Sequence, residues 1–254
     1  MTSTEQGRRK YDALADRYEE IYFYVADVGR QLVTFADPTE GARLLDVGAG
    51  RGAVARAALA RGCRVTAVDA SEGMVSRLAA DHPEITAEQQ DAGMLEFPSG
   101  SFDVVTAGFL IQTLAEPAIA LAEFRRVLAV GGTVALSLER PTVGRMGWLH
   151  DLSAEFFGSG SGDPLTADRL DELLESAGFA LAYQESVDIE KRLPDPAALW
   201  NWLELQGVPD ALATLPPDRA AEFRERFTSG AEQMHADGGI VLEFGATLHR
   251  AIAT

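Results

Sequence analysis

A glycine-rich turn between a predicted strand and a predicted helix constrains the fold of this chain more than any other feature. The strand begins at Leu44 with Leu-Leu-Asp-Val, and Gly48, Gly50 and Gly52 follow it. Glycine adopts backbone conformations that are closed to other residues, so the main chain can approach a ligand closely here. The helix that starts near Gly52 directs the positive end of its dipole to the same place, which favours a carboxylate or a phosphate. The turn therefore predicts a ligand site at the carboxyl end of a strand.

From residue 43 onward, short apolar runs alternate with amphipathic segments. The predicted strands are 43–48, 64–69, 85–90, 102–109 and 132–138, and the predicted helices between them are 51–61, 72–80 and 116–129. This alternation is typical of a parallel sheet that is covered by helices on both faces. Before the first strand, apolar residues at helical spacing over 10–36 predict one or two helices that end before Pro38.

The pattern changes after residue 140. Helices are predicted over 146–157 and 165–177, and strands over 179–193 and 240–252; Thr166 is the expected N-cap of the second helix and Gly178 its C-terminal stop. The segment 195–238 is helical in pattern, is interrupted by prolines and lies between the two strands, so we interpret it as a lid. We therefore predict an α/β fold, a doubly wound and mostly parallel seven-stranded sheet with N-terminal helices and a helical lid inserted before the last strand.

The charge of the chain excludes several classes of partner. Lys and Arg total 22 and Asp and Glu total 39, which gives a net charge of −17. Such a surface repels phosphate backbones and anionic membranes, so neither is an expected partner. The apolar stretches are far shorter than the ~20 residues of a membrane helix, and no signal peptide is apparent. The single cysteine, Cys63, excludes an internal disulfide and a cysteine-based zinc site. We expect a cytoplasmic protein without membrane insertion.

Two acidic residues end the next predicted strands. Asp69 ends the second strand, where it is placed to accept both hydroxyls of a ribose, and Asp91 comes at the end of the third, where it suits an adenine amino group. The turn starting at Gly48 also satisfies the dinucleotide pattern with Ala53 in its last place. The glycines alone are therefore also compatible with an NAD-dependent oxidoreductase.

With the strand Phe102–Gly108 and the turn Val127–Thr133, these motifs make the chain resemble the class I S-adenosylmethionine-dependent methyltransferases. The likeness is to the small-molecule branch, which includes enzymes of the ubiquinone and menaquinone type, and it covers roughly residues 11–140. It implies a Rossmann-like fold with S-adenosylmethionine as cofactor. The chain departs from the family at Val130, where a proline is common. That position shapes a turn and makes no contact with the cofactor.

The resemblance also implies positions around the cofactor. It assigns the methionyl part to Asp46, Gly48, Ala49 and Gly50, with Tyr18 covering it; the ribose to Asp69; the adenine face to Ala70 and Met74; the adenine edge to Asp91 and Ala92; and the sulfonium to the backbone at Gly108. Tyr11, Tyr22 and Tyr24 lie near Tyr18 in the sequence, and any of these rings could belong to the core instead. We expect one domain over 1–254, with a helical cap (1–40), a cofactor-binding core (41–140), the rest of the sheet (141–194 and 239–254) and the lid (195–238).

The residues that act on the acceptor are harder to identify. Methyl transfer requires alignment and the exclusion of water, and it needs a base only when the nucleophile must lose a proton. His150 and His235 are candidate bases, and Gln112, just beyond the fourth strand, is a candidate for orienting the substrate. No two histidines have the spacing of metal ligands, so no metal is expected.

We expect methyl transfer from S-adenosylmethionine to an oxygen, nitrogen or carbon nucleophile of a small molecule in secondary metabolism. The alternatives are a quinone-type C-methyltransferase, an S-adenosylmethionine-binding enzyme that steers a cyclisation, and an NAD-dependent oxidoreductase. The expected partner is the small-molecule substrate and not nucleic acid. The acceptor and the oligomeric state, a homodimer included, remain open.

Overall fold

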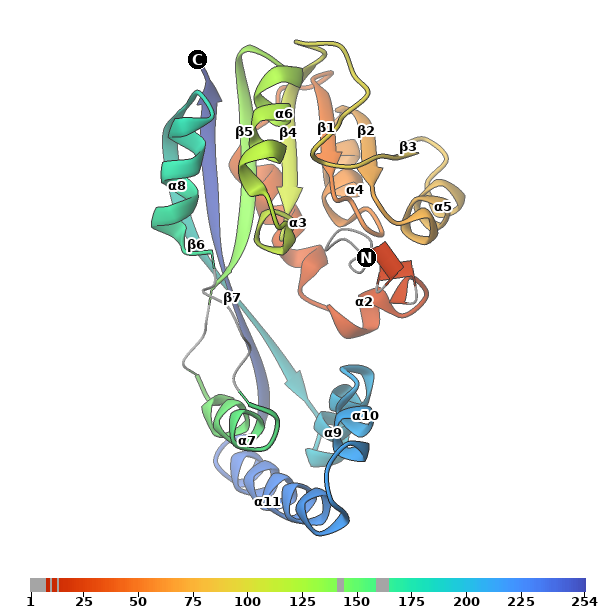
Figure 1. Ribbon diagram of the computed structural model, residues 1–254, viewed down its shortest axis with the longest axis vertical. Helices are drawn as coiled ribbons and strands as arrows, with labels where there is room; N and C mark the ends of the chain where they lie inside the picture. Colours follow the sequence, from red (N-terminus) through yellow and green to blue (C-terminus); the bar gives the residue numbers. More distant parts are fainter. Residues whose placement is uncertain (1–7, 10, 13, 141–143, 159–164) are drawn as a thin grey trace. The chain divides into compact units, whose positions relative to one another are not determined.

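The computed structural model describes residues 8–9, 11–12, 14–140, 144–158 and 165–254 (Figure 1). The strands are β1 (Arg43–Val47), β2 (Arg64–Asp69), β3 (Thr86–Gln89), β4 (Phe102–Gly108), β5 (Leu128–Arg140), β6 (Phe179–Leu193) and β7 (Ile240–Ala253). The helices are α2 (Tyr18–Ile21), α3 (Val25–Ala36), α4 (Ala53–Ala60), α5 (Glu72–Asp81), η1 (Ile111–Thr113), α6 (Pro117–Val127), α7 (Gly147–Phe157), α8 (Ala167–Ser176), α9 (Pro196–Leu205), α10 (Val208–Ala213) and α11 (Pro217–Ala236).

The seven strands form one sheet in the order β3-β2-β1-β4-β5-β7-β6. The pairs β3–β2, β2–β1, β1–β4 and β4–β5 are parallel. In Figure 1 the C-terminal half of β7 points in the opposite direction to β4. The mostly parallel seven-stranded sheet is therefore confirmed. The strand order reverses at β1, and open α/β sheets bind their ligands at such a switch point, beyond the carboxyl ends of the strands.

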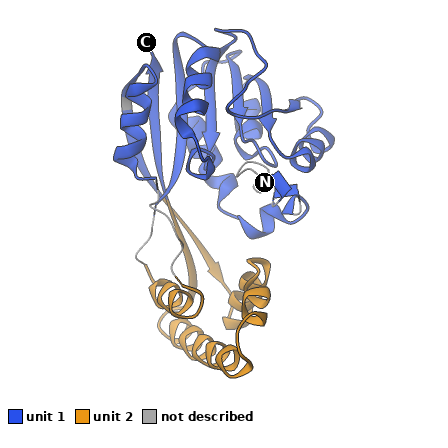
Figure 2. Cartoon of the chain, in the orientation of Figure 1, with its two compact units in different colours: residues 1–140, 164–187, 246–254 blue, residues 141–163, 188–245 orange. Residues whose placement is uncertain are grey.

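The chain divides into two compact units (Figure 2). Unit 1 consists of 1–140, 164–187 and 246–254, and unit 2 consists of 141–163 and 188–245. Strands β6 and β7 each contribute residues to both units. The two units do not follow the predicted subdivision, since α7 belongs to unit 2 together with the helices of 195–238. The single-domain organisation stays a prediction.

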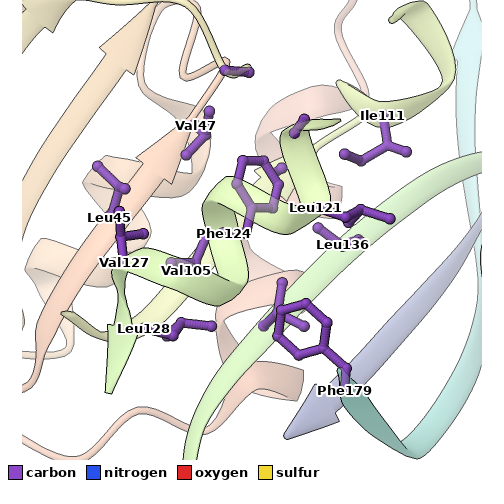
Figure 3. Packing of buried hydrophobic residues seen from close by; sticks show 14 of the residues in the cluster. Leu45, Val47, Val105, Ile111, Leu121, Phe124, Val127, Leu128, Leu136 and Phe179 are labelled. Carbon is purple, nitrogen blue, oxygen red and sulfur yellow. The ribbon is translucent and has the colours of Figure 1, made fainter. Parts of the chain in front are cut away.

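The core of unit 1 lies between the sheet and α6. Leu45, Val105 and Leu136 from the strands and Leu121 and Phe124 from α6 are all buried and form one apolar cluster (Figure 3). Full burial of a large aliphatic or aromatic side chain stabilises a fold by about 1.5–3 kcal/mol. This cluster therefore fixes the strands whose carboxyl ends carry the candidate site.

Strand β5 differs from its prediction at both ends. It begins at Leu128, four residues before the expected start, and its register against β4 shifts between the pairs Phe102–Leu128 and Val104–Thr133. The two adjacent glycines, of which Gly131 has a φ of +77°, form this irregularity inside the strand rather than a turn before it. The predicted helix over 116–129 accordingly ends at Val127. At its other end β5 continues to Arg140, beyond the predicted 138.

The termini of α8 are as predicted. The side chain of Thr166 accepts a hydrogen bond from the backbone N–H of Arg169 and caps the helix. Gly178 follows the helix with a φ of +85°, a conformation that favours glycine after a C-cap. Strand β6 then spans the predicted 179–193, and β7 extends one residue beyond the predicted 240–252.

Unit 2 is built around aromatic side chains. The ring of Phe227 lies 5.9 Å from that of Trp148 and 5.0 Å from that of Trp200, and the ring of Phe156 lies 5.4 Å from that of Phe223. The prolines of the segment 195–238 stand in the first turns of α9, α10 and α11, where proline is tolerated. The helical content of this segment is confirmed, and its role as a lid stays a prediction. None of the helices that the structure describes is long and apolar enough to cross a membrane.

Candidate functional site

A cavity of about 320 Å³ lies in unit 1 at the carboxyl ends of the first strands. This volume is in the range of small-molecule sites. It is lined by nine of the residues assigned to the cofactor, namely Tyr18, Gly48, Gly50, Asp69, Ala70, Met74, Asp91, Ala92 and Gly108, and also by Gln112. The other two assigned residues, Asp46 and Ala49, line a second space of about 30 Å³ that shares Tyr18, Gly48 and Gly108 with the first.

The turn after β1 exposes its main chain to the cavity. Gly48 and Gly50 have φ angles of +68° and +53°, which other residues rarely adopt. A Cβ at Gly48 would lie 2.8 Å from Cδ1 of Leu110, so the loop after β4 packs directly on this glycine. A Cβ at Gly50 would lie 3.8 Å from the ring of Tyr18. The absence of a side chain at Gly48 thus makes room for Leu110, and the absence of one at Gly50 leaves space between the turn and the ring of Tyr18.

Asp69, the last residue of β2, holds its carboxylate at the cavity. The backbone N–H of Gly50 donates to Oδ2 at 2.8 Å, and that of Ser71 donates to Oδ1 at 2.9 Å. Burial raises the pKa of this carboxyl, and the N–H donors partly offset the shift. Each carboxylate oxygen has two lone-pair sites. The carboxylate therefore keeps lone-pair sites that hydroxyl groups of a ligand can occupy.

The wall beyond β2 comes from α5 and the loop after β3. The side chain of Ser71 caps α5 by accepting a hydrogen bond from Met74 N at 3.1 Å, and Met74 itself is buried. Asp91 is exposed at the cavity, and its Oδ1 accepts a hydrogen bond from the backbone N–H of Gly93. Ala92 beside it is buried. The wall thus pairs apolar side chains with one accessible carboxylate.

Asp46 is directed into the protein rather than toward the large cavity. Its side chain is buried, the hydroxyl of Thr106 donates to Oδ1 at 2.9 Å, and the backbone N–H of Ala55 donates to Oδ2 at 3.1 Å. Burial raises its pKa to about 7, against the opposing effect of these two hydrogen bonds. The carboxyl group therefore ties β1 to β4 and to the first turn of α4.

Tyrosine side chains form the N-terminal wall of the cavity. Tyr11, Tyr18, Tyr22 and Tyr24 all line it, so the structure brings together the four rings between which the sequence could not choose. The ring of Tyr18 lies 4.9 Å from that of Tyr22, and the ring of Tyr24 lies 5.6 Å from that of Phe109. Burial raises the pKa of each phenol. The four phenols therefore stay protonated at neutral pH.

Sequence reasoning missed the loop after β4 and the end of β5. Phe109 has a φ of +54°, which is uncommon for a residue other than glycine, and its N–H donates to Oγ of Ser137 at 3.0 Å. Glu139 of β5 lines the cavity, and its backbone N–H donates to Oε1 of Gln112 at 2.7 Å. A longer strand prediction would have placed Glu139 at the carboxyl end of β5 without marking it as a site residue, and the sequence carries no signal for the conformation of Phe109.

The two candidate histidine bases do not line the cavity. His150 lies in α7 and His235 in α11, both in unit 2, whereas the lining comes from unit 1. Their role as bases stays a prediction. Within the described ranges, no group of three or more His, Cys, Asp or Glu side chains is arranged to hold a metal ion.

The sequence comparisons with known proteins indicate a methyltransferase. The family model of the methyltransferase domain matches residues 45–136, which run from within β1 through most of β5. The chain is 31% identical over 266 residues to the nocamycin O-methyltransferase of Saccharothrix syringae, across 90% of this chain and 91% of that protein. It is 34% identical over 176 residues to the demethylmenaquinone methyltransferase of Clavibacter sepedonicus, across 67% of this chain and 66% of that protein. Among solved structures it is similar to the [4+2]-cyclase SpnF, with a TM-score of 0.66 and 19% identity across 99% of this chain and 97% of that one.

Proposed function

Because this chain belongs to the class I S-adenosylmethionine-dependent methyltransferases that act on small molecules, we propose that it methylates an oxygen atom of its acceptor. The methyl donor is S-adenosylmethionine, and the acceptor is a small molecule. The choice of oxygen is supported by the relative that aligns with 90% of the chain, whose name is that of an O-methyltransferase.

The observation that carries the proposed site is the half-buried carboxylate of Asp69 at the cavity. Backbone N–H groups fix its orientation, and its remaining lone-pair sites can accept hydrogen bonds from a ribose diol. The neighbouring residues fit the rest of an adenosyl group. Met74 and Ala70 offer an apolar surface to the adenine, and the carboxylate of Asp91 can accept a hydrogen bond from the adenine amino group.

The remaining assigned residues fit the amino-acid part. The open turn at Gly48, Ala49 and Gly50 leads to the first turn of α4, whose dipole favours a carboxylate. We propose that Asp46 acts here by fixing the turn, because both of its oxygens already accept hydrogen bonds from the protein. When bound, S-adenosylmethionine supplies a methyl group that is already activated by its sulfonium.

The protein therefore has to align the acceptor and exclude water. Alignment of two reactants can supply on the order of 7–11 kcal/mol of the barrier. The tyrosine wall and Phe109 give the cavity an apolar, aromatic surface. Such a surface suits a step in which positive charge is dispersed as the methyl group leaves the sulfur. Aromatic rings also tolerate a nearby cation through their π systems.

The direct test combines binding with product analysis. S-adenosylmethionine should raise the melting temperature of the protein, and NAD should not. Incubation with donor carrying a carbon-13 methyl group and a panel of small molecules should yield S-adenosylhomocysteine and one methylated product. The carbon-13 chemical shift of the transferred methyl then distinguishes oxygen from nitrogen and carbon.

Each alternative gives a different result in this test. A methyl on carbon would favour the quinone-type reaction, to which the demethylmenaquinone methyltransferase relative points. Cofactor binding with product formation but without S-adenosylhomocysteine would favour a cyclisation, a reaction named for the structural neighbour SpnF. Stabilisation by NAD alone would contradict the proposed site.

A further inference from the structure

Glu139 lies one strand beyond the place expected for the reacting methyl group. Strands β4 and β5 are parallel, and Gly108, the residue assigned to the sulfonium, pairs with Ser137. Glu139 follows Ser137 by two residues, so both side chains belong to the same face of β5. Neighbouring strands lie about 4.8 Å apart. The carboxylate of Glu139 is therefore close to the place where an acceptor would meet the methyl group.

Gln112 holds Glu139 at both its main chain and its side chain. Oε1 of Gln112 accepts a hydrogen bond from the backbone N–H of Glu139 at 2.7 Å, and Nε2 donates to Oε2 of Glu139 at 3.5 Å. Gln112 belongs to η1, which directly follows β4 and the loop at Phe109. The clamp thus connects the end of β5 to the loop after β4.

The other groups around Glu139 are phenols and apolar side chains. Burial is the largest cause of the raised pKa of Tyr22 and of Tyr24, and the charge of Glu139 is the next largest. These phenols therefore remain protonated beside Glu139. Phe109 and Leu114 line the same cavity. A planar aromatic molecule matches these surfaces, and the carboxylate of Glu139 is the one anionic group at this end among the described lining residues.

The charges of the described lining residues favour one kind of acceptor oxygen. These residues include the carboxylates Asp69, Asp91 and Glu139 and one cationic side chain, Arg8. An acceptor carboxylate would be repelled by Glu139 and needs no base, since it is ionised at neutral pH. A phenolic hydroxyl has a pKa near 10 and benefits from a base as its oxygen attacks.

We propose that Glu139, positioned by Gln112, is the catalytic residue that accepts the proton of an aromatic hydroxyl acceptor; this inference rests on the proposed function. The O–H bond of the acceptor breaks and its proton goes to the carboxylate. An electron pair of the oxygen forms the new O–CH3 bond, and the pair of the broken S–CH3 bond stays on the sulfur. The products are an aryl methyl ether and S-adenosylhomocysteine. Glu139 is exposed, so it returns the proton to solvent.

The test compares Glu139→Gln with Glu175→Gln, a control that removes an exposed carboxylate in α8, away from the cavity lining. The probes are β-naphthol and β-naphthoic acid, which share one ring system and differ in the oxygen group. For β-naphthol, Glu139→Gln should lower kcat by on the order of 10²–10⁴ and abolish the acidic limb of its pH profile. Its affinity for S-adenosylhomocysteine should not change, and Glu175→Gln should behave as the wild type.

A second variant separates catalysis from positioning. Gln112→Ala should lower kcat by a smaller factor and keep the acidic limb, because the base is still present. An unchanged kcat or acidic limb in Glu139→Gln would overturn the proposal, as would preferential methylation of β-naphthoic acid. Transfer to neither probe by a protein that binds S-adenosylhomocysteine would overturn the aromatic acceptor and leave the methyltransferase function intact. Failure of the wild type to bind S-adenosylhomocysteine would instead contradict the proposed site.

Discussion

At the β2 end of the cavity, main-chain N–H groups hold a half-buried carboxylate, whereas at the β5 end the side chain of Gln112 holds Glu139. Asp69 accepts hydrogen bonds from the backbone of Gly50 and Ser71. Glu139 is exposed and is held by Gln112. A site built from main chain depends on the fold, and a site built from side chains can change by substitution. This difference between the two ends fits an enzyme family in which the methyl donor is constant and the methyl acceptor varies.

The largest expected effect is at the β2 end. Asp69→Ala should weaken the binding of S-adenosylhomocysteine by more than about 100-fold, because hydrogen bonds to a charged group contribute about 1.5–3 kcal/mol each and two are lost. Isothermal titration calorimetry measures the affinity directly. Asp91→Ala is the matched variant, because it removes the exposed carboxylate in the loop after β3. Its loss of affinity for S-adenosylhomocysteine should be smaller. An equal loss in both variants would remove the distinction between the half-buried carboxylate of Asp69 and the exposed one of Asp91.

The glycine turn gives the second test. Gly48→Ala should destabilise the fold by about 2–5 kcal/mol, the sum of about 1–2 for the left-handed backbone and about 1–3 for overpacking against Leu110. Gly41 has a φ of +77° with open space around its Cβ position, so Gly41→Ala should cost the backbone part alone. Urea denaturation of the two variants measures both free energies. Equal midpoints would mean that Leu110 does not pack on the turn as described.

The third test uses the pH dependence of stability. The pKa of Asp46 is raised to about 7 in the folded protein, against about 3.9 when unfolded. Between these values the folded state binds more protons, so the free energy of unfolding falls as pH rises, by up to about 1.4 kcal/mol per unit. In Asp46→Asn this contribution should disappear, and the variant should gain stability over the wild type as pH rises. Thermal unfolding at several pH values checks this, and parallel curves for the two proteins would contradict it.

The smallest effect is expected at the tyrosine wall. Tyr18→Phe should change the affinity for S-adenosylhomocysteine by less than about threefold, because the ring and its packing against Tyr22 are retained. Tyr18→Ala should lose about three- to tenfold, which corresponds to about 0.5–1.5 kcal/mol. Fluorescence titration can resolve the two. A large loss in Tyr18→Phe would assign a direct hydrogen bond to the phenol.

The same contrast explains what the sequence could predict. Strands β1, β2 and β4 lie within one residue of their predicted bounds, because most of their interior positions are apolar. Asp69 follows from the predicted end of β2, of which it is the last residue. The predicted start of β5 was wrong. Gly131 and Gly132 resemble a turn in the sequence, but in the structure they form an irregularity within the strand.

The β5 end of the cavity could not be predicted in the same way. Glu139 lies one residue beyond the predicted strand, and nothing local distinguishes it from the other acidic residues of the chain. Its proximity to Gln112 depends on the loop after β4, where Phe109 adopts a positive φ without being glycine. Long-range pairing of this kind has no period or motif in the sequence. It becomes visible only once the strands are aligned.

The most direct test of the account is a crystal structure of the protein with S-adenosylhomocysteine. We expect the ribose hydroxyls within hydrogen-bond distance of both oxygens of Asp69, the adenine between Met74 and Asp91, and the sulfur facing the cavity beside Gly108. A nucleoside bound with its ribose away from Asp69, or with its sulfur away from the β4–β5 end, would contradict the assignment of the two ends of the cavity.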